Sequence, residues 1–587
     1  MKKVLCTLLF LAALTVNVFA QAPVNVFDPF YEDVSLWEGI GLINDAPSVR
    51  PFPLQEIKRL LLLVIGNGDS GQRRRAEEYY NRFFGRTFHF GGLAELAITV
   101  PKKQRELNLS PFMDLNYALH ELFTISGRVS AFLTNKRFSQ ALTPEFQYSK
   151  YDIADDAVSV GPLYVLPLFN TGVAIGTARY YVSAGISRTS YGPFHENSPF
   201  VGSQAIHQGQ FAFVLNREKW TYNQAFLALT ATNDLKDNRR PGKFMMIHSL
   251  TVRPLPWISF AIVDTMIYGK RFEPIYLLPL SAFFVSQGLY DFPDNSLIGG
   301  SFTIKPIRGL RLDGALYSDD IGFNEIVKFK KDAKWRMSGQ FGITYTMPST
   351  HWFSFADLNY TVVFPYTYTH YDNYDTKAPN YQNYTHNGIP LGSNLDPNSD
   401  RLQLRLKFRP LYGLDINFSE TFIRHANTTE SADDIIQLKD FISKHYTTDG
   451  STFNYSTVTE LDENNQSASK KNAFLYSTPF MKQQTIQYVN QLALDVSCHL
   501  PILKSSGYML FKFGYVFETN INPGVRQNIY KPVPELKGWD KRLIKDMSDE
   551  EIQKIKDIAA DQLAQWRADA RSTQFNHYIR LSAEVAY

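Results

Sequence analysis

The chain has 587 residues, with 60 Lys and Arg against 57 Asp and Glu, and a net charge of +3 at pH 7. This balance excludes a strongly basic protein, so we expect neither nucleic-acid binding nor a polybasic membrane contact. Of the two cysteines, only Cys498 lies beyond the leader described next, so no intramolecular disulfide is expected.

The first residues have the pattern of a secretory signal peptide. Lys2 and Lys3 precede an apolar run over 4–18, and Ala20 completes a small-residue cleavage pattern. We therefore assign residues 1–20 to a signal peptide and exclude them from the fold. No later run approaches the roughly twenty apolar residues that a transmembrane helix needs.

Residues 21–87 are predicted to form a small periplasmic helical bundle. Its three helical segments are "DVSLWEGIGLI", "PLQEIKRLLLLVIG" and "SGQRRRAEEYYNRFFG", the last ending at Gly85. The "GDSG" at 68–71 resembles a serine-protease nucleophile loop, but we favour a helix start with Ser70 as the N-cap. A bundle this small buries little surface alone, so we expect it to dock on another part of the chain.

From residue 88 onward the hydrophobic pattern has a period of two. In "RLQLRLKFRP" (401–410), three leucines and a phenylalanine alternate with polar and basic residues, and "FNHYIRLSAEVAY" ends the chain in the same way. Period two indicates strands with one apolar face. Aromatic residues make up 14% of the chain, as expected for a barrel with aromatic girdles. We predict that the apolar face meets lipid and that the following residues line the lumen: Arg401, Gln403, Arg405, Lys407, Arg409 and Arg580.

The connections between these strands differ sharply in length. Short turns such as "RPLPW" and "RPLYG" alternate with long polar stretches, of which the longest are 366–400, 424–484 and 520–573. This predicts a mainly β fold, a transmembrane antiparallel β-barrel of about 18 strands over 88–587, with short periplasmic turns and long external loops. We expect a monomer in outer-membrane lipid, assembled by the barrel-assembly machinery through the strand that ends at Tyr587.

Few motifs suggest chemistry. The "HEN" at 195–197 lacks the second histidine of a zinc protease, and Asp319 with Asp320 is more simply a solvated strand end than a cation site. We expect no metal, no cofactor and no enzymatic activity. Residues 548–570 form a predicted helix with a capping box from Ser548 and Glu551, which either covers the barrel mouth or binds a partner.

Two stretches, 187–213 and 248–320, resemble the capsule assembly Wzi family. In that family a Tyr-Gly strand end leads into a loop with an aromatic-x-x-Pro element, then an Asn-initiated strand and an acidic strand end. The matching residues here are Tyr268, Gly269, Tyr276, Pro279, Asn295, Asp319 and Asp320. The resemblance implies an outer-membrane barrel of eighteen strands with a periplasmic helical bundle, acting as a lectin that holds polysaccharide at the cell surface.

The resulting functional hypothesis is non-enzymatic binding of a surface polysaccharide. Arginine could pair with uronate carboxylates, and tyrosine could stack on sugar rings and hydrogen-bond through its hydroxyl. The alternative is a porin or solute channel, because barrels of this size can enclose an aqueous lumen. The candidate glycan-binding residues, in two predicted external loops and the strand end before the second, are Arg188, Tyr191, His195, Tyr268, Arg271 and Tyr276.

Overall fold

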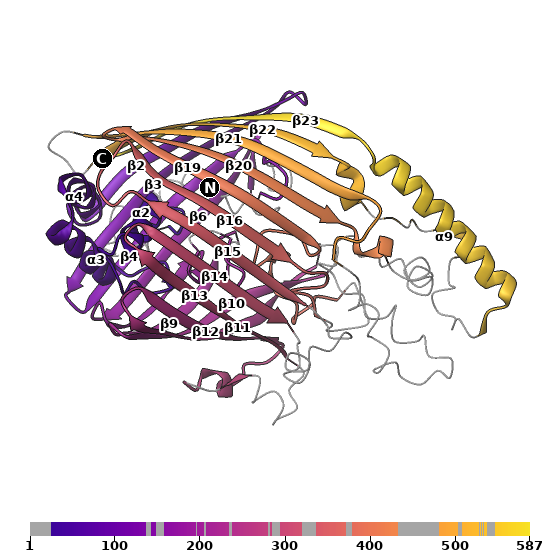
Figure 1. Ribbon diagram of the computed structural model, residues 1–587, viewed down its shortest axis with the longest axis horizontal. Coiled ribbons are helices and arrows are strands. Elements are labelled where there is room, and N and C mark those ends of the chain that lie inside the picture. The colour runs from indigo at the N-terminus through magenta and orange to yellow at the C-terminus, as the bar shows by residue number, and fades with distance from the viewer. Residues whose placement is uncertain are drawn as a thin grey trace, which may run out of the picture.

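A computed structural model shows a closed antiparallel β-barrel of eighteen strands (Figure 1). Each strand pairs with the next along the chain, and the first and last close the barrel through pairs such as Gly91↔Ala586. The short β5 (Val158–Val160) adds to the edge of β6. The mainly β barrel predicted from the sequence is thereby confirmed. The structure describes residues 25–136, 142–147, 158–194, 197–204, 207–233, 238–279, 282–283, 294–319, 336–370, 378–431, 480–502, 507–527, 529, 531, 533–536 and 546–587.

The eighteen strands are long, and most are joined alternately by short turns at one end and long connections at the other. The predicted signal peptide lies outside the described residues. The barrel strands are β2 (Phe88–Val100), β3 (Gln104–His120), β4 (Phe123–Thr134), β6 (Leu163–Gly176), β7 (Tyr180–Ser187), β9 (Gln208–Asn216), β10 (Trp220–Thr232), β11 (Arg239–Leu255), β12 (Ile258–Gly269), β13 (Asn295–Ile307), β14 (Leu310–Asp319), β15 (Met337–Thr346), β16 (Phe353–Val363), β19 (Ser399–Leu411), β20 (Leu414–Ala426), β21 (Ile486–Pro501), β22 (Tyr508–Ile521) and β23 (Thr573–Ala586).

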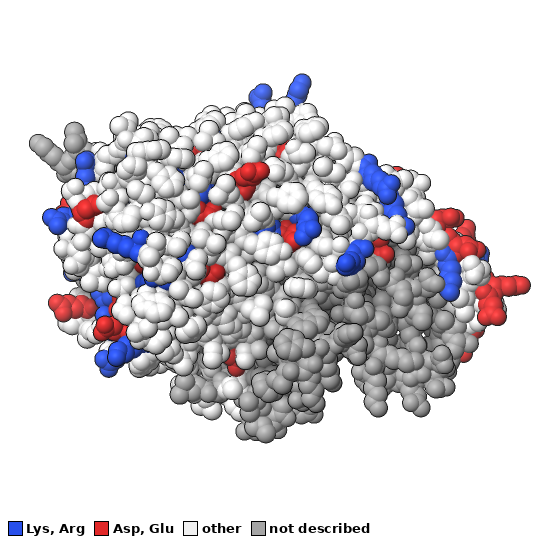
Figure 2. Space-filling view, in the orientation of Figure 1, with Lys and Arg blue, Asp and Glu red and all other residues white. Residues whose placement is uncertain are grey.

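Alternation along the strands separates an apolar outer face from a polar inner face. On β19, Leu402 is 46% exposed whereas its neighbour Arg401 is 5% exposed. Figure 2 shows that the wall on this side of the barrel is largely uncharged and that charged residues gather toward its two ends. An apolar band around a barrel is the surface that an outer-membrane protein presents to lipid.

Three helices lie at the end of the barrel where the short turns are (Figure 1): α2 (Pro29–Gly39), α3 (Leu54–Asn67) and α4 (Ser70–Phe84). They share an aromatic core that includes Phe30, Tyr79 and Phe83. In the part of the chain that the structure describes, no helix is long and apolar enough to cross a membrane.

The helices dock on the barrel, as expected for so small a bundle. Gly309 of a short turn donates its N–H to Gly39 O of α2 at 3.1 Å. At another turn, Asp69 accepts from the backbone N–H of Thr350 at 2.7 Å. Asp69 is also the N-cap of α4, with Gln72 completing a capping box. The N-cap predicted at Ser70 was therefore wrong by one residue, because Ser70 is already the first helical residue and the Asp69 carboxylate accepts from the backbone N–H groups of Gly71 and Gln72.

The predicted C-terminal helix is confirmed as α9 (Asp549–Ala570), with the expected capping box from Ser548 and Glu551. It lies beyond the strand ends at the opposite end of the barrel from α2–α4 (Figure 1). Its apolar stripe packs on residues of its own long connection, among them Val525 and Leu536. Arg567 of α9 forms an ion pair with Glu430 of the neighbouring connection, at 2.8 Å.

Candidate functional site

The lumen is occupied by segments that fold inward from both ends. The N-terminal segment after α2 forms β1 (Val49–Arg50), which pairs antiparallel with β8 (Ser190–Tyr191) from the connection between β7 and β9. Arg50 reinforces this pairing, because its Nη1 donates to Gly192 O at 3.3 Å and to Phe194 O at 3.2 Å. A segment from the helical end thus meets a long connection from the other end inside the barrel.

Two of the predicted glycan-binding residues lie in this inward-folded connection. Arg188 is 3% exposed and donates to the carbonyl oxygens of Ser203 and Gln204 at 3.2 and 3.0 Å. Burial lowers the pKa of Arg188 to about 9, so the guanidinium stays charged at neutral pH. Tyr191 is 1% exposed and belongs to the main apolar cluster of the lumen. His195 lies outside the described residues.

A second long connection, between β16 and β19, also folds inward and packs on the first. Tyr368 donates its hydroxyl to Pro199 O at 2.7 Å, and Tyr384 donates to Phe200 O at 2.5 Å. The rings of these two tyrosines stack with their centroids 5.2 Å apart. These two tyrosines, with their hydroxyls hydrogen-bonded, therefore belong to the apolar cluster in the half of the lumen nearer the long connections.

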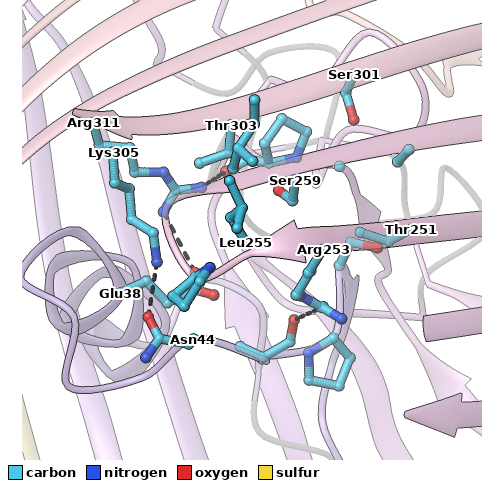
Figure 3. Close-up of a pocket in the computed structure, with 18 of the residues that line it drawn as sticks. Glu38, Asn44, Thr251, Arg253, Leu255, Ser259, Ser301, Thr303, Lys305 and Arg311 are labelled. Atoms are coloured by element: carbon cyan, nitrogen blue, oxygen red, sulfur yellow. Dashed lines mark hydrogen bonds and ion pairs between the residues drawn. The ribbon is translucent and has the colours of Figure 1, made fainter. Parts of the chain in front are cut away.

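Between this aromatic packing and the helices lies a small basic pocket of about 70 Å³ (Figure 3). Lys305 donates to Asn44 at 3.0 Å, and Arg311 pairs with Glu38 at 3.4 Å. The pocket has room for several water molecules. Its cations come from β1, β11, β13 and β14, and are Arg50, Arg253, Lys305 and Arg311.

Positive charge dominates this pocket. Arg253 donates to Ala46 O at 3.1 Å and to Thr221 Oγ1 at 2.7 Å, and Arg50 likewise donates to carbonyl oxygens. Burial lowers the pKa of Arg50, and the carboxylate of Glu38 opposes that shift. These arginines are used as hydrogen-bond donors that hold the N-terminal segment against the wall, with Glu38 as the acid in the lining.

The predicted lumen residues of β19 contact the helices and neighbouring strands. Lys407 forms an ion pair with Glu32 of α2, and Arg405 contacts the same carboxylate at 3.4 Å. Arg409 pairs with Asp33 at 2.6 Å. Farther along the strand, Arg401 donates to Asn394 and Gln403 donates to Thr421. On β23, Arg580 pairs with Glu95 at 3.0 Å.

The second predicted glycan-binding set lies on the opposite side of the barrel wall. Residues 270–279, which we call the strap, leave the end of β12 and turn back over its outer face, with η2 (Pro274–Leu277) outside the barrel in Figure 1. Beneath the strap, Met246 and Met266 are fully buried, although Ile262 on the same outer face is 63% exposed. The strap therefore shields part of a wall that elsewhere faces lipid.

Tyr268, Arg271 and Tyr276 hold the strap in place. Tyr276 donates its hydroxyl to Asp294 at 2.8 Å, and its ring lies 5.1 Å from that of Tyr268. Arg271 also forms an ion pair with Asp294, and the Arg271 side chain is 35% exposed. The barrel wall separates these residues from Arg188 and Tyr191, so the two candidate sets do not form one site. Burial raises the pKa of Tyr276, and so does its hydrogen bond to the Asp294 carboxylate.

The end of the barrel near the strap also carries a basic and aromatic pair that the sequence did not single out. Lys270 is exposed, and its Nζ lies 5.2 Å from the ring centroid of Tyr381, a half-buried residue of the β16–β19 connection. The two residues are more than a hundred positions apart and belong to different connections. No local pattern could have joined them, although Tyr381 belongs to a tyrosine-rich stretch over 366–386.

Proteins of similar architecture are found among solved structures. No family profile matches the chain, and no curated protein matches it. Among solved structures, Wzi of Escherichia coli, described as an outer-membrane protein involved in group 1 capsule assembly and a carbohydrate-binding β-barrel, is 13% identical. The match covers 97% of this chain and 99% of Wzi, with a TM-score of 0.50.

Two porin-type structures from Pseudomonas aeruginosa are less similar. OccD3 is 10% identical over 86% of this chain and 91% of its own, with a TM-score of 0.39. OprD is 8% identical over 85% and 94%, with a TM-score of 0.38. With its closed wall of eighteen strands and its helices at the short-turn end, the chain is an outer-membrane β-barrel that has the fold of Wzi.

Proposed function

We propose that this barrel binds a surface polysaccharide at the end that carries its long connections, without catalysing a reaction. The observation that carries the proposal is the packed lumen, in which β1 pairs with β8 and two connections fold inward. Such an interior suits a rigid support for surface loops better than a solute pathway. The similarity to Wzi over almost the whole chain adds support, since that protein is described as carbohydrate-binding.

The proposed contact surface is the rim formed by Lys270, Arg271 and Tyr381. Tyr381 offers a ring face on which a sugar could stack, with a hydroxyl at its edge. Lys270 and Arg271 supply positive charge for the carboxylates of acidic sugars. Arg188 and Tyr191 remain in this proposal as buried residues that hold the inward-folded connection, because a glycan would have to displace that connection to reach them.

The experiment is binding of purified native surface polysaccharide to the folded barrel, measured by biolayer interferometry. Tyr381→Ala and Lys270→Gln should each weaken binding at least about fivefold, because stacking and cation contacts of this kind are worth about 1 kcal/mol or more. The matched control is Tyr412→Ala. Tyr412 forms a similar pair with Arg74, whose guanidinium lies 3.3 Å from the ring centroid, at the opposite end of the barrel.

Two results would contradict the proposal. Unchanged binding by both rim variants would reject the rim as the contact surface. Absence of binding by the wild type, together with steady ion conductance of the barrel in planar bilayers, would favour the channel alternative instead.

A further inference from the structure

Three polar side chains lie side by side on the outer face of the barrel, where lipid would be expected. Gln224 of β10 is paired with His248 of β11, which is paired with Asp264 of β12. Their neighbours on the same face, Leu250 and Ile262, are 40% and 63% exposed. Placing such a row of polar side chains in hydrocarbon costs free energy unless the polar groups are hydrogen-bonded.

The strap and the residues just beyond it cover this row and form hydrogen bonds to two of its members. Gln224 donates its side-chain amide to Leu277 O at 2.6 Å, and Asp264 accepts from the backbone N–H of Phe283 at 2.7 Å. The Phe283 ring covers His248, with ring centroids 4.3 Å apart. The strap is therefore anchored to the outer wall by polar contacts as well as by its apolar side chains.

An apolar groove of about 530 Å³ opens on the outer wall where the strap ends at Pro279. Cross-strand pairs such as Leu215↔Tyr222 and Tyr222↔Leu250 place the lining residues on the outer face. Lys219 lies at its other end, in the short turn between β9 and β10, and its carbonyl accepts from the backbone N–H of Arg253, whose guanidinium faces the lumen. The apolar lining comes from three neighbouring strands and consists of Phe213, Leu215, Trp220, Tyr222, Leu250 and Val252.

We propose that this groove binds one acyl chain of a phospholipid, with the phosphate of that lipid held at the β9–β10 turn. The groove is continuous with the apolar outer face, so its natural surroundings are acyl chains. At the turn, Arg217 and Lys219 are exposed on either side of Glu218, which leaves a net positive charge where a phosphate would lie. Because the turn is at the end that carries the helices, the lipid belongs to the leaflet on that side.

The strap gives this site a shape that a flat barrel wall lacks. A chain lying between Pro279 and the wall contacts protein on more than one side. It therefore makes more van der Waals contacts with the protein than a chain on the open wall does. This predicts one lipid held more tightly than the others around the barrel. The inference is independent of polysaccharide binding, which concerns the rim beyond the strand ends.

The test is native mass spectrometry of the full-length barrel, purified in detergent and loaded with dipalmitoyl phosphatidylglycerol. The wild type should retain one lipid at collision energies that remove all others. Val252→Trp fills the groove and should reduce the retained fraction at least tenfold. Ile262→Trp places the same side chain on the same outer face outside the groove, and should retain the lipid as the wild type does.

A second variant tests the headgroup contact. Arg217→Gln/Lys219→Gln should reduce retention of the lipid at least threefold while the groove remains open. Heat-modifiable mobility on gels verifies that all variants are folded. The proposal is overturned if Val252→Trp and Ile262→Trp retain lipid equally, or if the wild type retains none. It is equally overturned if native preparations hold lipopolysaccharide or a second copy of the chain at this face.

Discussion

Arg409 of β19 donates a hydrogen bond to Asp33 of helix α2 across 2.6 Å, and so joins the barrel wall to the helical bundle. The same carboxylate, which is 1% exposed, accepts from Arg75 at 3.0 Å and from the Tyr79 hydroxyl at 2.6 Å. One buried acid thus connects two helices to a strand that is more than three hundred residues away in sequence.

Asp33→Asn should loosen the docking of the helices. Removing one partner of a buried ion pair costs about 3–5 kcal/mol, and we expect the lower part of that range because Asp415 still forms ion pairs with Arg75 and Arg409. The measurement is the urea concentration at which a protease cleaves the helices while the barrel keeps its folded mobility on gels. Glu77→Gln, an exposed acid on α4, is the control and should leave that concentration unchanged.

The docking should also depend on pH. Burial alone would raise the pKa of Asp33, but Arg409, Arg75 and Lys407, with the Tyr79 hydroxyl, hold it well below its usual range. A carboxyl with a depressed pKa in the folded state stabilises that state above its unfolded pKa of about 3.9, and the contribution is lost as the pH falls further.

Protection of the helices from an acid-stable protease should therefore be constant from about pH 7 to pH 5 and should fall below about pH 4. In Asp33→Asn the fall should be smaller, because the group that binds the proton is absent. An equally steep fall in the variant would show that other carboxyl groups control the docking.

Side-chain direction on β19 gives a third prediction. Leu404 lies on the outer face and Gln403 on the inner face, where it donates to Thr421 at 3.2 Å. Leu404→Arg should reduce barrel stability by about 2–4 kcal/mol, the cost of a charge near the middle of the lipid-facing surface. Gln403→Arg adds the same charge toward the lumen and should cost much less.

The measurement for this pair is the fraction of each variant that refolds into lipid vesicles at a fixed urea concentration. The structure makes Gln403→Arg a better control than removal of the next inward residue, Arg405. That arginine contacts Glu32 and Asp357, so its loss would leave two acids with fewer partners. Equal refolding of Leu404→Arg and Gln403→Arg would mean that the two faces are assigned the wrong way round.

The barrel was predictable from the sequence because its signals are local. Alternation in 401–410 fixes the two faces of a strand, and the contrast between short and long connections fixes the strand count. The candidate site was less predictable. Tyr276 was expected in an external loop, but the strap returns over the outer wall, where its apolar residues pack on Met246 and Met266 and its backbone accepts from Gln224. Such a return depends on partners as far away in the sequence as Gln224, which lies 53 residues before Leu277, and neither the period of the strands nor turn chemistry encodes it.

The pairing of β1 with β8 leads to the last prediction. Val49 lies directly opposite Tyr191, and directly opposed residues of antiparallel strands have Cα atoms about 4.5–5.5 Å apart, within the range that a disulfide spans. In a Cys498→Ser background, Val49→Cys/Tyr191→Cys should therefore form a disulfide on mild oxidation, detected as a gel shift that reduction reverses. Val49→Cys/Ser190→Cys should not, because neighbouring side chains on a strand point to opposite faces. Failure of the first pair, or equal cross-linking of both, would mean that the N-terminal segment does not pair with this connection inside the lumen.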